Sequence, residues 1–312
     1  MDQLIKVMNL DKRYGDKKVV NKISFAIRSG EILCFLGPNG AGKSTTINIL
    51  AGVLGADGGE IQYKGKRMQD AKKEYQYHLG VVPQDLALYE DLTAMQNVCF
   101  FASLYGLKGK DLREKADQAL LFVGLSERKD QKVKTFSGGM KRRLNIACAI
   151  AHEPELVIMD EPTVGIDPQS RNHILESIRE LRRHGMTVLY TTHYMEEVEE
   201  ISTRIIVMDD GSLIAEGTKE ELKESISDKR KFTLTVESDA LNVDEFYRIE
   251  GVTEIRTKEG VIEITTLKNV ENLDKIISLA LSQNIKINNV VCQTANLETV
   301  FLSLTGKSLR DE

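Results

Sequence analysis

Residues 32–45 read ILCFLGPNGAGKST. The stretch opens with five apolar residues, which are typical of a buried strand, and continues into a glycine-rich turn with the pattern G-x-x-x-x-G-K-[ST]. Apolar residues then recur at the i, i+3, i+4, i+7 spacing of one buried helix face, at Ile47, Leu50, Ala51 and Leu54. A strand, a glycine loop and a helix in this order predict a phosphate-binding loop at a helix N-terminus.

The loop predicts a site for a nucleoside triphosphate and magnesium. Backbone N–H groups of such a loop turn toward phosphate oxygens, while Lys43 reaches the β- and γ-phosphates and Ser44 ligates Mg²⁺. The nucleotide-binding residues predicted from this motif are Gly37, Pro38, Asn39, Gly40, Ala41, Gly42, Lys43, Ser44 and Thr45. Kinases, GTPases and many ATPases share the loop, so the motif alone leaves the reaction open.

A second apolar run, LVIMDE at residues 156–161, ends in two carboxylates. Such a strand end can hold a magnesium-bound water and orient an attacking water, so we expect Asp160 to take the metal and Glu161 to take the water. The alternative is a strand that merely ends in a solvated acidic pair. The phosphate loop in the same chain favours the metal and water roles.

Ser137, Gly138 and Gly139 stand before a helix-period segment at about 141–151. A serine and two exposed backbone amides at a helix N-terminus form a second anion-binding site. In the alternative interpretation, Ser137 is only an N-cap beside flexible glycines. With the anion site, one chain would contain two phosphate sites.

The order of segments predicts two domains. Up to about residue 223, strand-like apolar runs alternate with helix-period segments, which indicates an α/β domain with a largely parallel sheet. Two helices without a strand between them predict a helical insertion at about 88–135. The charged stretch ELKESISDK at 221–229 indicates a domain boundary or a short helical linker. We therefore expect a nucleotide-binding domain at 1–225 and an accessory domain at 230–312.

The accessory domain is predicted to have the βαββαβ order of a ferredoxin-like α+β fold. Its expected elements are strand 230–237, helix 241–247, strands 252–258 and 261–266, helix 269–283 and strand 286–292, with a further helix near 296–305. The sequence of this region has no phosphate loop, no carboxylate pair at a strand end and no metal-ligand motif. We therefore assign it no catalysis.

Composition excludes several classes of protein. The 42 basic and 47 acidic residues give a net charge of -5, which offers no positive field for a nucleic acid, so no nucleic-acid partner is expected. The four cysteines lie far apart with no C-x-x-C, which indicates reduced thiols and not a metal site. The best apolar stretch, 98–107, is half of the roughly 20 residues that cross a bilayer, so no membrane span is expected.

The three motifs in this order make the chain resemble the nucleotide-binding subunit of an ATP-binding cassette (ABC) transporter. The resemblance implies roles for four further residues: an aromatic that stacks on adenine at Tyr14, a metal-contacting loop residue at Gln84, a loop residue after the second carboxylate at Asp167, and a switch histidine near the γ-phosphate at His193. Each has a plainer alternative, namely an exposed turn aromatic, a solvated loop residue, a helix N-cap, and a capping or core histidine.

The resemblance also implies how such a subunit works. It is an ATPase that forms a homodimer, in which ATP and Mg²⁺ at Lys43, Ser44 and Asp160 of one chain are covered by residues 137–139 of the other. A separate transmembrane permease, held near Gln84 and the helical insertion, supplies the transport path. The subunit is then cytoplasmic and peripheral to the inner face of the cell membrane. The segment NLETVFLSLTG, at the C-terminal end, resembles the drug- and antibiotic-exporter branch, so export is expected over import.

Other ABC-type ATPases remain as alternatives. A soluble ATPase that regulates a protein or ribosome partner usually carries two cassettes, whereas this chain has one set of motifs. Chromosome-maintenance ATPases place long coiled coils between the two phosphate sites, whereas Lys43 and Ser137 are 94 positions apart. A subunit that binds ATP without hydrolysis would be expected to lack Glu161 or His193, and both are present.

Overall fold

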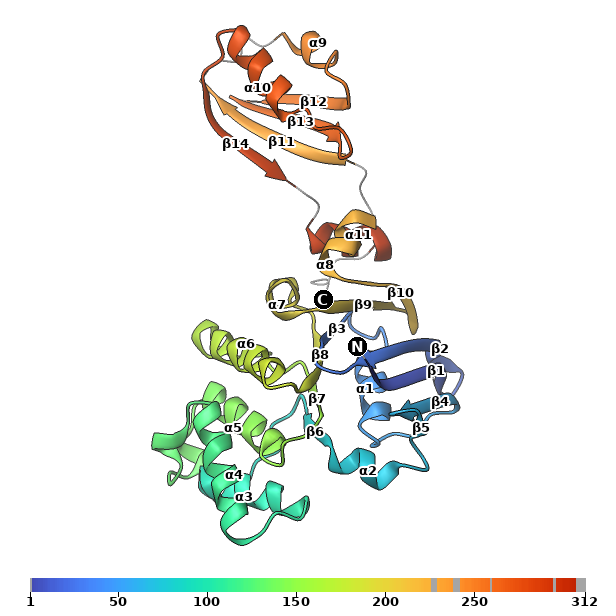
Figure 1. The fold of residues 1–312 in the computed structure, drawn as a ribbon, viewed down its shortest axis with the longest axis vertical. Coiled ribbons are helices and arrows are strands. Elements are labelled where there is room, and N and C mark those ends of the chain that lie inside the picture. The colour runs from blue at the N-terminus through green and yellow to red at the C-terminus, as the bar shows by residue number, and fades with distance from the viewer. Residues whose placement is uncertain (1, 226–228, 238–241, 259, 294–295, 307–312) are drawn as a thin grey trace. The chain divides into compact units, whose positions relative to one another are not determined.

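The computed structural model describes residues 2–306 except 226–228, 238–241, 259 and 294–295. The chain divides into two compact units, the first reaching Lys219 and the second covering Glu220–Gly306. The first unit contains two sheets and the second contains one (Figure 1).

A six-stranded sheet forms the centre of the first unit, in the order β10-β9-β3-β8-β7-β6. Its strands are β3 (Ile32–Leu36), β6 (Leu79–Val82), β7 (Leu156–Asp160), β8 (Thr187–Thr192), β9 (Arg204–Asp209) and β10 (Ser212–Gly217). Five strands are parallel, and β10 pairs antiparallel with β9. Every residue of β3 and β7 is buried, because parallel strands are covered on both faces, and this explains their uninterrupted apolar sequences. The predicted α/β class with a largely parallel sheet is confirmed.

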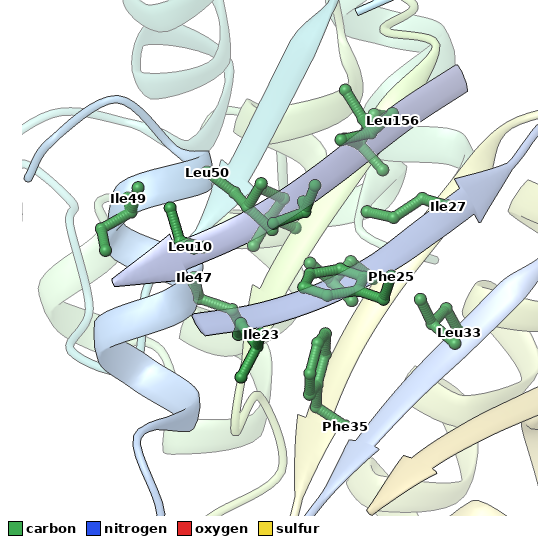
Figure 2. Packing of buried hydrophobic residues seen from close by; sticks show 14 of the residues in the cluster. Leu10, Ile23, Phe25, Ile27, Leu33, Phe35, Ile47, Ile49, Leu50 and Leu156 are labelled. Atoms are coloured by element: carbon green, nitrogen blue, oxygen red, sulfur yellow. The ribbon is translucent and has the colours of Figure 1, made fainter. Parts of the chain in front are cut away.

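An antiparallel sheet, which the sequence did not predict, lies against this centre. Its order is β2-β1-β4-β5, and its strands are β1 (Gln3–Tyr14), β2 (Lys17–Arg28), β4 (Gly58–Tyr63) and β5 (Lys66–Arg67). Figure 2 shows side chains of β1, β2, β3 and the helix after the phosphate loop meeting in one core. The rings of Phe25 and Phe35 meet edge to face with centroids 5.1 Å apart. This packing holds β3, and hence the start of the phosphate loop, against the antiparallel sheet and the helix after the loop.

Helices cover the central sheet and form the insertion. The covering helices are α1 (Lys43–Leu50), α5 (Gly138–Ile150), α6 (Pro168–Arg183) and α7 (Met195–Ile201), while the short helix α2 (Lys72–Tyr77) packs through Tyr75 against Tyr63 of β4. The insertion contains α3 (Ala94–Leu104), α4 (Gly109–Phe122) and the 3-10 turns η1 (Ser126–Arg128) and η2 (Val133–Thr135). A reciprocal capping box between Thr93 and Gln96 starts α3. Because α3 and α4 both pack against α5, this helix joins the insertion to the sheet.

The second unit is a four-stranded antiparallel sheet with helices. Its elements are α8 (Lys219–Ser225), β11 (Lys229–Val236), α9 (Val243–Phe246), β12 (Val252–Lys258), β13 (Val261–Leu267), α10 (Leu273–Ser282), β14 (Ile287–Gln293) and α11 (Leu297–Thr305). The strand order is β12-β13-β11-β14. Phe232, Leu234 and Ile264 point to a core that includes Phe246 of α9 and Ile276 of α10. Buried and more exposed residues alternate along β11 and β13, so the face of the sheet opposite this core is mostly polar.

The longest helix in the part of the chain that the structure describes is α6, with 16 residues. At 1.5 Å per residue it is about 24 Å long, short of a bilayer core of about 30 Å. No helix among the described residues is both long and apolar enough to cross a membrane.

Candidate active site

The phosphate loop joins β3 to α1 and has a backbone that only glycine adopts easily. Gly40 and Gly42 have φ of +80° and +100°, and a Cβ on Gly42 would lie 2.5 Å from the carbonyl oxygen of Val19. Gly42 is also the N-cap of α1, where no side chain caps the helix. The first N–H groups of α1 are therefore available to an anion.

The side chain of Lys43 is buried inside this loop. Its Nζ donates hydrogen bonds to the carbonyl oxygens of Gly37 (2.6 Å) and Pro38 (3.0 Å). Burial lowers the pKa of Lys43, while the nearby carboxylates of Glu161 and Asp160 oppose this shift. A further anionic partner stabilises a buried ammonium group, so the position of Lys43 Nζ suits phosphate oxygens.

Asp160 and Ser44 provide oxygen atoms for a metal at the end of β7. The Oγ of Ser44 lies 3.4 Å from Oδ1 of Asp160, and Thr191 donates a 2.6 Å hydrogen bond to the same carboxylate oxygen. Asp160 is buried, so its orientation is fixed by these hydroxyls. A carboxylate beside a hydroxyl is the hard oxygen donor set that Mg²⁺ prefers, so the residues fit this ion.

Glu161 adopts a backbone conformation that is uncommon for a residue with a side chain. Its φ is +46°, and its N–H donates a 2.9 Å hydrogen bond to Oγ1 of Thr191. The side chain of Glu161 lies beside His193, whose Nδ1 is 3.5 Å from Oε1 of Glu161. Non-glycine residues in this region of φ concentrate at functional sites, because the surrounding structure must offset the strain.

A cavity of about 200 Å³ contains much of the predicted site. It is lined by Val19, Asn39, Gly40, Ala41, Gly42, Lys43, Ser44, Thr45, Gln84 and Glu161. The fold therefore brings Gln84, which is distant in sequence, to the phosphate loop and the second carboxylate. Among the described residues, the other predicted site residues do not line it, namely Tyr14, Gly37, Pro38, Ser137, Gly138, Gly139, Asp160, Asp167 and His193.

The second predicted anion site lies at the start of α5. Ser137 is its N-cap, and its Oγ accepts a hydrogen bond from the N–H of Met140 at 3.3 Å. Asp167 likewise caps α6 by accepting from the N–H of Ser170 at 2.9 Å. A Cβ on Gly139 would collide with Ser170, so the two helix starts are in close contact. Ser137 and Asp167 are therefore helix N-caps, as the plainer interpretations had it. Each side chain accepts from one backbone N–H, so further N–H donors remain at both helix ends.

Tyr14 lies at the end of β1 and is 52% exposed, with Nζ of Lys12 5.8 Å from its ring centroid. An exposed aromatic ring near a cation can stack on a base, which is compatible with the predicted contact to adenine.

Sequence reasoning missed the residues that hold His193. Glu197 of α7 is 1% exposed and accepts hydrogen bonds from Tyr190 (2.8 Å) and Thr192 (2.7 Å). The Oγ1 of Thr192 in turn accepts from the N–H of Tyr194 at 3.0 Å. These bonds fix the backbone on both sides of His193. The sequence MEEVEE gave no signal for this role, because it resembles a solvated helix face.

Comparisons with known proteins agree with this geometry. A family model described as ABC transporter matches residues 20–164. The linearmycin resistance ATP-binding protein LnrL of Bacillus subtilis (strain 168) is 43% identical over 99% of this chain and 100% of its own length. The Nod factor export ATP-binding protein I of Burkholderia orbicola (strain AU 1054) is 36% identical over 97% of each chain. A solved structure of an ATP-binding subunit of an ABC transporter covers 78% of this chain and 98% of its own, with a TM-score of 0.65 and 29% identity.

Proposed function

The chain belongs to the ABC transporter family as an ATP-hydrolysing subunit, and we propose how its residues divide that work. The phosphate loop and Lys43 bind the β- and γ-phosphates of ATP. Ser44, Asp160 and Gln84 hold Mg²⁺, which when bound neutralises charge on the transferred phosphoryl group. Glu161 accepts the proton of the attacking water, and His193 faces the γ-phosphate. The observation that carries this assignment is the single cavity shared by the loop, Gln84 and Glu161.

We propose that two copies of the chain form the working unit. Ser137, Gly138 and Gly139 do not line the cavity of their own chain, yet they begin a helix with backbone donors to offer. In a two-fold dimer they can cover the ATP of the partner, with Asp167 beside them at the same helix contact. Tyr14 stacks on adenine. Phosphate contacts from both chains then close the dimer, and hydrolysis opens it.

We propose that the dimer drives a separate permease that exports its substrate. Relatives are named for linearmycin resistance and Nod factor export, which supports an exporter over a non-transport ATPase. An apolar face suited to a permease follows, in the chain, the Gln84 segment (residues 83–85, directly after β6). On it Tyr89, Phe100 and Leu104 are 49%, 39% and 67% exposed, and the rings of Tyr89 and Phe100 are 4.9 Å apart. A cytoplasmic segment of the permease bound there would hold the subunit at the inner face of the membrane.

The substitution Leu104→Glu tests this face. A charge placed in an apolar interface should lower copurification with the permease by about tenfold or more, with ATPase activity of the isolated chain unchanged. The matched control is Leu121→Glu, because Leu121 is 69% exposed on the neighbouring helix α4. Equal copurification of both variants would place the permease elsewhere. If no membrane protein copurifies with the unchanged chain, the transporter proposal itself fails.

We propose that residues 1–225 are the catalytic domain and 230–312 an accessory domain that pairs the two chains. The open face of the second unit's sheet carries charged pairs, Lys231 with Glu263 at 2.6 Å and Arg256 with Glu254 at 2.7 Å. Alternating charges of both signs let this polar face pair with its copy around a two-fold axis.

A chain that ends at Lys229 should hydrolyse ATP within about threefold of the full chain, because every proposed site residue precedes that point. It should also dimerise at least about tenfold more weakly without nucleotide, because it lacks the accessory domain. Sedimentation in the absence of ATP measures this difference. Equal association of the short and full chains would contradict the pairing role, and loss of hydrolysis would contradict the domain division.

A further inference from the structure

Three consecutive basic residues near the start of α5 bind three different parts of the fold. Lys141 pairs with Glu90 at 2.5 Å, and Arg143 donates to the carbonyl oxygens of Val123 and Gly124. Arg142 lies between them and is 5% exposed, so its guanidinium is shielded from water. A buried guanidinium must find acceptors, since it remains charged in proteins.

Arg142 donates hydrogen bonds to two successive backbone carbonyls of the Gln84 segment. Its Nη1 donates to the carbonyl oxygen of Pro83 at 2.8 Å, and its Nη2 donates to that of Gln84 at 2.6 Å. The planar guanidinium thus binds two successive peptide units at once, which fixes direction as well as distance. Arg142 therefore sets where the backbone of Gln84 lies, and Gln84 lines the cavity of the phosphate loop.

The helix that carries Arg142 begins at Ser137, the second predicted anion site. Arg142 is five residues from Ser137, which is about 7.5 Å along the axis of α5 at 1.5 Å per residue. The same helix also touches the strand that leads into the Gln84 segment, because a Cβ on Gly80 would collide with the carbonyl oxygen of Ala149. One rigid helix thus begins at Ser137, binds the Gln84 backbone and contacts β6.

We propose that Arg142 is a positioning residue that couples the two ATP sites of the dimer. This inference rests on the proposed dimer, in which Gln84 serves the ATP of its own chain while residues 137–139 serve the ATP of the partner. When ATP draws the Gln84 segment toward the phosphate loop, the segment and α5 move together, because separating them would leave the buried guanidinium without acceptors. Binding at one site thereby orients the helix end that completes the other site, which is a coupling free energy between two sites.

The test compares Arg142→Lys with Arg143→Lys in the full chain. Lysine keeps the charge but cannot bind two carbonyls with a planar fork. Arg142→Lys should lower the Hill coefficient of ATP hydrolysis toward 1 and lower kcat by about tenfold, while the affinity of the isolated chain for ATP changes less than about twofold. Arg143→Lys alters the same residue type, also bonded to two carbonyls, but those carbonyls lie outside the Gln84 segment. It should keep the Hill coefficient of the unchanged chain.

Arg142→Gln gives a second measurement that leaves no unpaired buried charge, and the same loss of cooperativity is expected from it. An unchanged Hill coefficient in either Arg142 variant overturns the inference, and so does a Hill coefficient of 1 in the unchanged chain. Equal losses in the Arg142 and Arg143 variants would show a general effect of loosening α5, and would also overturn it. The dimer is tested separately by gel filtration of Glu161→Gln with ATP. If that variant dimerises while Arg142→Lys stays cooperative, only the role of Arg142 is wrong.

Discussion

A chain carrying Glu161→Gln is expected to bind ATP with nearly unchanged affinity and to hydrolyse it at least about 100-fold more slowly. Glutamine has the shape of glutamate and keeps the backbone N–H bond to Thr191, but its amide cannot accept a proton from water. The phosphate contacts remain, so a closed dimer with ATP should accumulate. Phosphate release at saturating ATP measures the first effect, and gel filtration with ATP measures the second.

Glu153→Gln is the control for this prediction. Glu153 also has a positive φ, +55°, but its carboxylate pairs with Lys115 and does not line the phosphate-loop cavity. Its variant should turn over ATP within about twofold of the unchanged chain. Near-normal turnover of Glu161→Gln would remove its role as proton acceptor. A comparable loss in Glu153→Gln would mean that a general loss of stability, and not the missing carboxylate, slows the reaction.

The parts of the fold predicted from sequence are those with a local pattern. Strands β3 and β7 are buried on both faces, so their continuous apolar runs could be recognised without any knowledge of their neighbours. The strand β1 was missed because its alternation is interrupted. Leu4 and Ile5 are both buried, and the register with β2 shifts between Val7 and Leu10 and again before Lys12. Bulges of this kind are set by pairing with a partner strand, which a single sequence does not display.

The candidate site likewise contains residues that a local sequence motif reveals and residues that only tertiary packing reveals. Lys43 and Ser44 belong to a short local motif, so the sequence alone was enough to predict them. In the structure both residues line the cavity together with Glu161. Arg142 and Glu197 could not be found in this way. Each lies in a run of like charges, and only tertiary packing turns that residue inward, to 5% and 1% exposure. Burial of a charged side chain depends on tertiary partners, here Pro83 for Arg142 and Arg171 for Glu197.

Mixing two inactive variants, Lys43→Ala and Ser137→Asp, is expected to restore activity. Lys43→Ala removes the buried ammonium that binds phosphate oxygens, so hydrolysis should fall by at least about 100-fold. Aspartate caps a helix as well as serine does, so α5 and the stability of the chain should be preserved. Its negative charge would repel the phosphates of an ATP that faces this helix end, and hydrolysis should again be lost.

The mixture distinguishes a site shared between chains from a site within one chain. In a mixed dimer the Ser137→Asp chain supplies an intact Lys43, and the Lys43→Ala chain supplies an intact Ser137, so one of the two composite sites is whole. Random pairing at equal concentrations makes about half of the dimers mixed, each with one working site, so the turnover should recover to at most about a quarter of that of the unchanged chain, and to less where the two sites are coupled. If Ser137 acted on the ATP of its own chain, every site in the mixture would carry a defect and no activity would return. Recovery in proportion to mixed dimers would therefore establish that residues 137–139 serve the partner, because no arrangement within a single chain can produce it.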